Sequence, residues 1–219
     1  MTLSGKRILI LLGGQWHDFD GFAGAIGPLL QTHGMQVEAT YDLDKLLHLA
    51  ENQYDAVLSY TCFTSDEGGA KGGPDRLTQA QFDGLAGWIR RGGALLALHA
   101  ATVIGESDPA LGDLIGGVFI SHPPQFSFTV YPMFGEHPIT AGIEAFTVND
   151  EFYVETYTPD VHVHMLAFDR GIAYPMAWSR IEAQGRVAHI APGHSQQVWD
   201  LEPYQRLLLQ ALDWLTERD

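Results

Sequence analysis

The sequence has little that would mark a secreted, nucleic-acid-binding or membrane-embedded protein. It contains a single cysteine, Cys62, which excludes an intramolecular disulfide framework and makes a reducing cytoplasm the expected compartment. Basic side chains number 12 against 27 acidic ones, and the formal net charge is −15. This charge disfavours binding to nucleic acid or to anionic lipid. A neutral or cationic small molecule, or a metal ion, is compatible with it.

Long hydrophobic runs are also missing. The apolar run near the N-terminus is about seven residues long, too short to span a membrane. It leads into a glycine pair rather than a cleavage site, so we expect a first buried strand and no signal peptide. Two glycine-rich stretches, GGQWHDFDGFAG and SDEGGAKGGPDR, lack the spacing of dinucleotide- and phosphate-binding loops. We therefore expect no nucleotide cofactor.

What is present is an apolar content of 46%, enough to fill a core, and a regular alternation of strand and helix signals in the first half. Strands are expected at 7–12, 36–41, 54–60 and 93–98, and helices at 22–32, 44–52 and 78–91. A loop rich in glycine is expected at 68–74. This order predicts an α/β fold with a doubly wound, mostly parallel sheet of the flavodoxin-like type.

The second half has a different pattern. Residues 126–133, 146–154 and 161–168 alternate like antiparallel strands, 173–179 and 186–191 read as a hairpin, and 201–217 as a closing helix. We therefore expect an added antiparallel β layer. No polar linker separates the halves, so residues 1–219 are predicted to form a single domain.

Histidine is frequent, with ten in the chain, and four of them directly follow expected strands. Because ligands in such sheets collect beyond the carboxyl ends of the strands, these four are expected to share one rim. They are His17, His99, His122 and His194, and the strand expected before His122 is the short segment 118–120. A structural role is the interpretation for the others: His33 and His48 on helix surfaces, His162 and His164 on one strand face, His137 as a turn cap and His189 packed in a strand.

Carboxylates accompany the four histidines. Asp18 adjoins His17, and Asp150 and Glu151 leave another strand and could face the same rim. Imidazole with carboxylate suits zinc, manganese or non-haem iron, and equally general acid–base catalysis. The histidines are far apart in sequence and lack HExxH-type spacing, so the residues alone leave both chemistries open.

The stretch GGALLALHAAT predicts a buried strand that runs into a tight turn. In α/β enzymes such a turn often presents a nucleophile, usually Ser or Cys, but the residue here is His99. Cys62 follows another strand and has no basic neighbour in sequence, which favours a packed rather than a reactive thiol.

Taken together, these stretches resemble the trehalose-utilisation (ThuA-like) family of the class I glutamine amidotransferase-like superfamily. The resemblance covers nearly the whole chain, and six motifs occur in the expected order. They are ILLGGQWHD with His17 and Asp18, GGALLALHAAT with His99, GGVFISHPP with His122, EHPITAGI with His137, VNDEFYV with Glu151 and Tyr153, and YPMAWSRIEAQGRVAHIAPGHS with Trp178, Arg186 and His194.

The resemblance implies a fold that agrees with the expected sheet. It also implies that glutamine hydrolysis is absent, because amidotransferases carry a catalytic Cys at the turn and a His-x-Glu pattern that GHS here does not continue. Members of the family are associated with the catabolism of trehalose and related disaccharides, alongside oxidoreductases that make 3-keto sugars. The implied substrate is therefore a small sugar.

Three functions compete. The first is a hydrolase, lyase or isomerase acting on a disaccharide or keto-sugar, in which a base exploits the acidity of C–H bonds beside a keto group, with or without a divalent metal. The second is a non-catalytic sugar-binding or regulatory module, and the third a hydrolase that uses Cys62. Oligomeric state is undecided, and a homodimer is the working hypothesis.

For the first function the residues are assigned as follows. The catalytic residues are His99, His194 and Glu151; the substrate-binding residues are Trp16, Asp18, Tyr153 and Trp178; the metal ligands, for zinc, manganese or iron, are His17, His99, His122 and His194.

Overall fold

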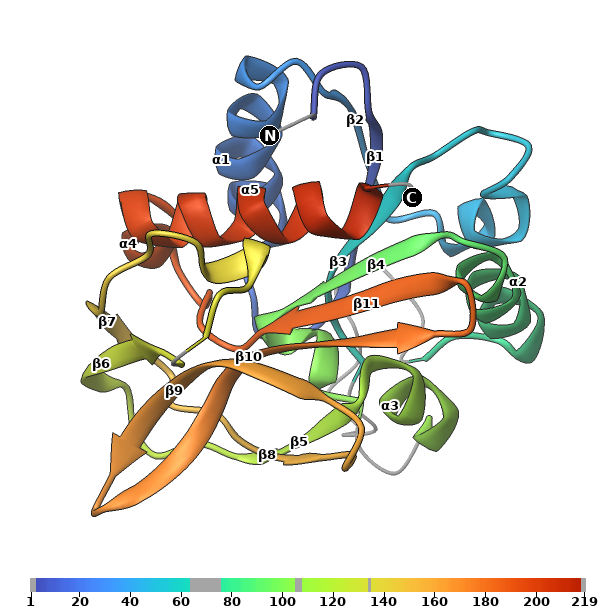
Figure 1. Ribbon diagram of the computed structural model, residues 1–219. Coiled ribbons are helices and arrows are strands. Elements are labelled where there is room, and N and C mark those ends of the chain that lie inside the picture. Colours follow the sequence, from blue (N-terminus) through green and yellow to red (C-terminus); the bar gives the residue numbers. More distant parts are fainter. Residues whose placement is uncertain (1–2, 64–75, 105–107, 134, 218–219) are drawn as a thin grey trace.

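A computed structural model describes residues 3–63, 76–104, 108–133 and 135–217, and within them nine strands form one sheet (Figure 1). The strand order is β2-β1-β3-β4-β11-β10-β9-β6-β7. The first five strands pair in parallel and the remaining pairs are antiparallel. Their bounds are β1 Arg7–Gly14, β2 Gln36–Thr40, β3 Ala56–Cys62, β4 Ala94–Leu98, β6 Phe126–Pro132, β7 Phe146–Asp150, β9 His162–Asp169, β10 Ile172–Glu182 and β11 Gly185–Ile190.

The mixed α/β architecture with a large parallel portion is as predicted, but the antiparallel strands do not form a separate layer. Strand β11 pairs in parallel with β4 and, along its other edge, antiparallel with β10. The hairpin β10–β11 therefore joins the two halves of the chain into one continuous sheet. A separate two-stranded sheet pairs β5 (Gly117–Ser121) with β8 (Val154–Tyr157).

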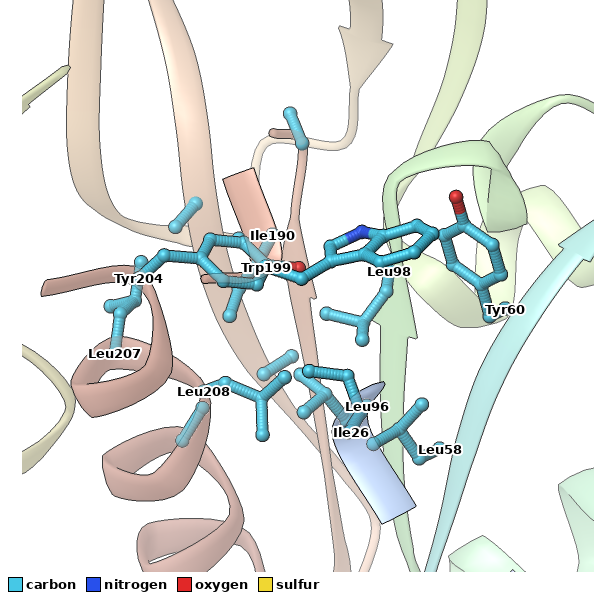
Figure 2. Close-up of a cluster of buried hydrophobic side chains, with 14 of the residues drawn as sticks. Ile26, Leu58, Tyr60, Leu96, Leu98, Ile190, Trp199, Tyr204, Leu207 and Leu208 are labelled. Carbon is cyan, nitrogen blue, oxygen red and sulfur yellow. The ribbon is translucent and has the colours of Figure 1, made fainter. Parts of the chain in front are cut away.

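Helices cover both faces of the parallel portion because its strands are apolar on both sides. In β1, Ile8, Ile10 and Leu12 pack into the core beneath α1 (Phe19–Thr32) and α5 (Glu202–Thr216), whereas Leu9 and Leu11 face the opposite cluster. Figure 2 shows part of the first cluster, in which side chains of α1 and α5 meet those of the central strands. On the opposite face lie α2 (Gln79–Arg90), the 3₁₀ helix η1 (Leu43–His48) and α3 (Pro109–Ile115).

Two expected elements differ from the structure. Residues 146–154 do not form one strand: β7 ends at Asp150, and Val154 begins β8 in the other sheet. The Asp150 carboxylate accepts the backbone N–H of Glu151, a local bond that competes with continuation of the ladder. The helix expected at 44–52 is the shorter 3₁₀ helix η1, and α3 and the four-residue α4 (Gln196–Trp199) were not expected.

Other local predictions are confirmed. Thr78 begins α2 with a capping box, in which its hydroxyl accepts the Gln81 N–H while the Gln81 side chain accepts the Thr78 N–H. The glycine-rich loop expected at 68–74 lies outside the described residues. In the described ranges, no helix is both long and apolar enough to span a membrane.

Candidate active site

The carboxyl ends of β1, β4 and β11 bring three of the four expected histidines together. These strands lie in the parallel portion of the sheet; His99 follows β4 directly, and His17 and His194 lie in the loops after β1, which ends at Gly14, and β11, which ends at Ile190. Ring centroids are 5.0 Å apart for His17 and His99, and 4.9 Å for His17 and His194. Glu151, which follows β7, reaches the same place.

His99 occupies the turn expected after the β4 strand. Its φ of +44° is a left-handed conformation that is uncommon outside glycine, and the 3₁₀ helix η2 (His99–Thr102) starts there. Nδ1 donates to the carbonyl of Ala191 at 2.7 Å, and the ring of Tyr153 stacks on the imidazole with centroids 4.2 Å apart. Nε2 of the ring lies 3.4 Å from Oε2 of Glu151.

His17 is held in the same way. Its Nδ1 donates to the carbonyl of Gln15 at 3.0 Å, which leaves Nε2 as an acceptor. Burial lowers the pKa of His17 to about 3, with the neighbouring His99 acting in the same direction. At neutral pH the ring of His17 is therefore uncharged.

Glu151 is the acidic member of the group. Burial would raise the pKa of its carboxyl, but His194 and His99 outweigh burial and hold that pKa below its usual range. In turn, the interaction with Glu151 raises the pKa of His194, against the effect of burial. The carboxylate is therefore ionised at neutral pH, with Oε2 3.3 Å from Nδ1 of His194.

The four groups converge on one point. One nitrogen from each of His17, His99 and His194 and one oxygen of Glu151 all lie within 4.8 Å of one another. Nε2 of His17, Nε2 of His99 and Nδ1 of His194 are buried and have no hydrogen-bond partner within the described residues. Nε2 of His17 thus lacks a partner within the described residues, and the nitrogens of His99 and His194 share one carboxylate oxygen, an arrangement that is costly unless something binds them.

This donor set fits a divalent transition metal. Imidazole nitrogen with one carboxylate oxygen suits zinc, manganese or iron. Tetrahedral ligands at the usual zinc distances lie about 3.4 Å apart. The Glu151 oxygen lies 3.4 Å from His99 and 3.3 Å from His194, close to that spacing. The carbonyls that fix Nδ1 of His17 and of His99 are the outer partners that metal-binding histidines normally have.

His122 lies beside this group and not within it, contrary to its expected place among the metal ligands. It follows β5, which belongs to the two-stranded sheet, so its strand does not end at the same rim. Its Nδ1 donates to the carbonyl of Pro123 and its Nε2 lies 3.7 Å from Oε1 of Glu151. The side chain is 35% exposed, whereas that of His99 is fully buried.

The four expected substrate-binding residues have different surroundings. Trp16 is 73% exposed and adjoins His17. Asp18 accepts the N–H of Gly21 and caps α1. Tyr153 is buried against His99. Trp178 is fully buried and donates its indole N–H to a backbone carbonyl, so its predicted contact with a sugar is wrong.

Cys62 is only 1% exposed, and burial raises the pKa of its thiol to about 12. A neutral, inaccessible thiol is a poor nucleophile. This arrangement argues against the function that would use Cys62 for hydrolysis.

Histidines assigned structural roles lie away from the site. His137 caps the 3₁₀ helix η4 (Pro138–Thr140) by accepting a backbone N–H, as expected, and His189 is fully buried in β11. His162 and His164 share a face of β9, with ring centroids 4.8 Å apart. His164 is 2% exposed and hydrogen-bonds with the hydroxyl of Ser179.

The buried His164 predicts weaker folding in mild acid. Burial, followed by the nearby His137 and His162, lowers its pKa to about 3. The unfolded chain therefore binds the extra proton between pH 6.5 and 3, and the stabilising effect of the neutral ring is lost as pH falls through that window. Below pH 6.5, the free energy of unfolding should fall more steeply with decreasing pH in the native chain than in the His164→Gln variant. The expected difference in slope is up to about 1.4 kcal/mol per pH unit.

Urea unfolding at pH 7, 6 and 5 measures this difference. The exposed His33 provides a control, since His33→Gln should keep the native pH slope. Equal slopes for His164→Gln and the native chain would contradict the assignment.

Comparisons with known proteins agree with the fold. The family model described as ThuA, trehalose utilisation, matches residues 7–215. A putative ThuA-like protein from Bacteroides uniformis superimposes with a TM-score of 0.77 at 19% identity, covering 99% of this chain and 94% of that one. One from Parabacteroides merdae gives a TM-score of 0.82 at 14% identity, covering 97% and 90%.

A β-galactosidase from Rahnella sp. R3 is similar over part of its length. The TM-score is 0.61 at 11% identity, and the match covers 96% of this chain but 31% of the β-galactosidase chain. In a comparison with curated proteins, none matches.

Proposed function

The chain belongs to the ThuA trehalose-utilisation family, and from this premise we propose that it is a sugar-catabolic enzyme acting on a disaccharide or keto-sugar at the His17–His99–His194–Glu151 site. In this proposal the site holds a zinc, manganese or iron ion, and the reaction is a hydrolysis, elimination or isomerisation. The single observation that carries the proposal is the convergence of three buried imidazole nitrogens on one ionised carboxylate, with two of the nitrogens sharing a single carboxylate oxygen.

The metal would be held by His17, His99, His194 and Glu151. When bound, such an ion polarises a carbonyl oxygen or a water molecule as a Lewis acid. The protein prepares the donors in advance: burial keeps His17 neutral, and carbonyl acceptors fix the ring orientation of His17 and His99. Less reorganisation is then needed when the ligand arrives.

Proton transfer is assigned to His122. Its Nδ1 is held by a carbonyl, its Nε2 faces Oε1 of Glu151 at 3.7 Å, and it is the most exposed of the four histidines expected at the site. A partly exposed imidazole can exchange protons with water and with a substrate C–H or O–H group. The division of roles is that three histidines bind and the fourth moves protons.

Trp16 supplies the surface for the sugar. Trp16 as a whole residue is 73% exposed, and its backbone adopts φ +69°, a conformation that is unfavourable for a bulky residue. Apolar indole faces pack well against sugar rings, and Trp16 adjoins the ligand His17. We expect Trp16→Ala to raise KM for a disaccharide more than it lowers kcat.

Metal analysis of the purified protein tests the proposal. We expect about one equivalent of zinc, manganese or iron, and loss of at least about tenfold in affinity in His17→Ala. His33→Ala removes an exposed histidine at the C-terminal end of α1, the end opposite His17, and should retain the native metal content.

The purified protein could instead be free of metal and turn over a keto-glycoside only while His99 and His194 are present. That result would contradict the metal site and support acid–base catalysis by the histidines. A protein that binds sugars without turnover and without metal would instead be the non-catalytic sugar-binding or regulatory module.

A further inference from the structure

Three alternate residues of one extended segment contact the turn that carries His99. Glu151 approaches His99 Nε2 at 3.4 Å, the ring of Tyr153 stacks on the same imidazole, and Glu155 accepts a hydrogen bond from the Thr102 hydroxyl at 2.6 Å. Glu151 and Tyr153 lie in the connection between β7 and β8, and Glu155 lies in β8. The segment 151–155 therefore holds both ends of the η2 turn.

The turn needs such support. His99 has φ +44°, and η2 has no side-chain cap at its N-terminus. A non-glycine residue in this region persists only when the surrounding structure fixes it. Thr102 lies in the same 3₁₀ turn and is fully buried, and its hydroxyl lies 2.6 Å from Oε1 of Glu155 and 3.2 Å from the carbonyl oxygen of His99.

Glu155 is itself part of a buried pair. Its side chain is 2% exposed, and Oε1 lies 3.3 Å from Nε2 of the fully buried His189. The indole of Trp178 covers His189, with ring centroids 4.3 Å apart. Oε2 of Glu155 and both ring nitrogens of His189 have no hydrogen-bond partner among the described residues.

A buried carboxylate and imidazole whose hydrogen bonds are incomplete contribute little to the stability of a fold, and apolar residues of the same volume often stabilise it as well or better. The pair is also separate from the metal-binding atoms, since none of its members belongs to the converging group. Within the described part of the chain, the side-chain hydrogen bond that the pair does make is directed at the His99 turn.

We propose that Glu155, backed by His189, is a positioning residue that fixes the η2 turn through Thr102 and so aims Nε2 of His99 into the site. The inference rests on the proposed function only in assuming that His99 binds a metal. How firmly the His99 ring is fixed in its orientation can be measured in the metal-free protein.

Thr102→Val removes the hydroxyl at constant shape and is the decisive variant. We expect its affinity for Zn²⁺, measured by calorimetric titration of the metal-free protein, to fall about 10- to 100-fold, the usual effect of losing an outer partner. Thr102→Ser keeps the hydroxyl and should restore the native affinity. Glu155→Gln keeps a hydrogen-bond acceptor but loses the charge, so its affinity for Zn²⁺ should lie between those of Thr102→Val and Thr102→Ser.

Ser179→Ala is the matched control. It removes another buried hydrogen bond, the one between Ser179 of β10 and His164 of β9, and both residues lie outside the Glu155–Thr102 contact. It should lower the melting temperature while leaving Zn²⁺ affinity unchanged.

A second readout separates the two proposals. In metal-free protein, the Nδ1–H of His99, bonded to the Ala191 carbonyl, should give a slowly exchanging imidazole proton in NMR spectra. This proton should exchange at least about tenfold faster in Thr102→Val and at the native rate in Thr102→Ser and Ser179→Ala.

A native protein that binds no Zn²⁺ would refute the metal site, while the exchange rates would still test the positioning role. Native exchange and affinity in Thr102→Val, with only a lower melting temperature, would overturn the positioning role.

Discussion

Under the proposed function, replacing His99 by asparagine is expected to lower the turnover of a 3-keto-disaccharide by about 10³-fold or more, because the site loses one of its four metal-binding groups and with it the polarisation that the metal would supply. His99 supplies a buried nitrogen that no other side chain of the converging group can replace, because each of the others already faces the same point. Asparagine tolerates the left-handed backbone at this position better than alanine, so the turn keeps its shape. The measurement is kcat/KM of the variant and of the native protein, each reconstituted with the same metal.

Two controls make this result specific. Cys62→Ala should keep activity within about twofold, because the thiol is buried and neutral. Far-UV circular dichroism should show that His99→Asn remains folded. Native activity in His99→Asn would refute the histidine site. Loss of activity in Cys62→Ala would instead support hydrolysis by the Cys62 thiol.

The sequence could predict the parallel strands and the three histidines that follow them, because both depend on local signals. A continuous apolar run such as RILILL predicts a strand buried on both faces. The rule that ligands gather at the carboxyl ends then places His17, His99 and His194 together. The family resemblance added the expectation of the same fold, which the structure shares.

His122 was misplaced because strand pairing is not local. Its strand has the same appearance as the others, but β5 pairs with β8 and not with the main sheet. The prediction for Trp178 failed for a related reason, because alternation along β10 does not show which face of the strand is covered. Its indole N–H donates to the carbonyl of Ile115, the last residue of α3. That helix was not expected from the sequence.

The neighbouring carboxylates Asp150 and Glu151 could not be distinguished from sequence either. Both leave β7, and both were expected to face the rim. Glu151 faces the histidines, whereas Asp150 is fully buried and accepts the backbone N–H groups of Glu151, Gly193 and His194. The two carboxylates therefore have different contacts: Glu151 faces the side chains of the candidate site, and Asp150 binds the backbone of the turn that carries His194.

Asp150 anchors the turn that presents His194. Gly193, with φ +147°, approaches so closely that a Cβ there would lie 2.8 Å from the Tyr204 hydroxyl. The Gly193 carbonyl accepts from the indole of Trp199 and from Tyr60, side chains that Figure 2 shows close together, and its N–H donates to Asp150 at 2.6 Å. The turn is thus held from both sides.

Asp150→Ala is expected to lower the free energy of unfolding by about 3–5 kcal/mol, because three backbone N–H groups lose their acceptor. Asp150→Asn keeps one oxygen acceptor and should lose less. Asp108→Ala is the matched control: this partly exposed carboxylate accepts one N–H at the start of α3, and its removal should cost about 1 kcal/mol. Urea unfolding of the metal-free proteins at pH 7 gives all three values.

The same variants connect the anchor to the site. If Asp150 sets the position of His194, Asp150→Asn should bind Zn²⁺ at least about tenfold more weakly than the native protein while remaining folded. Asp108→Ala should bind it with native affinity, since α3 contributes no residue to the converging group. An Asp150→Ala protein as stable as the Asp108→Ala control would show that the backbone N–H groups find other acceptors, and that the turn is fixed by Trp199 and Tyr60 alone.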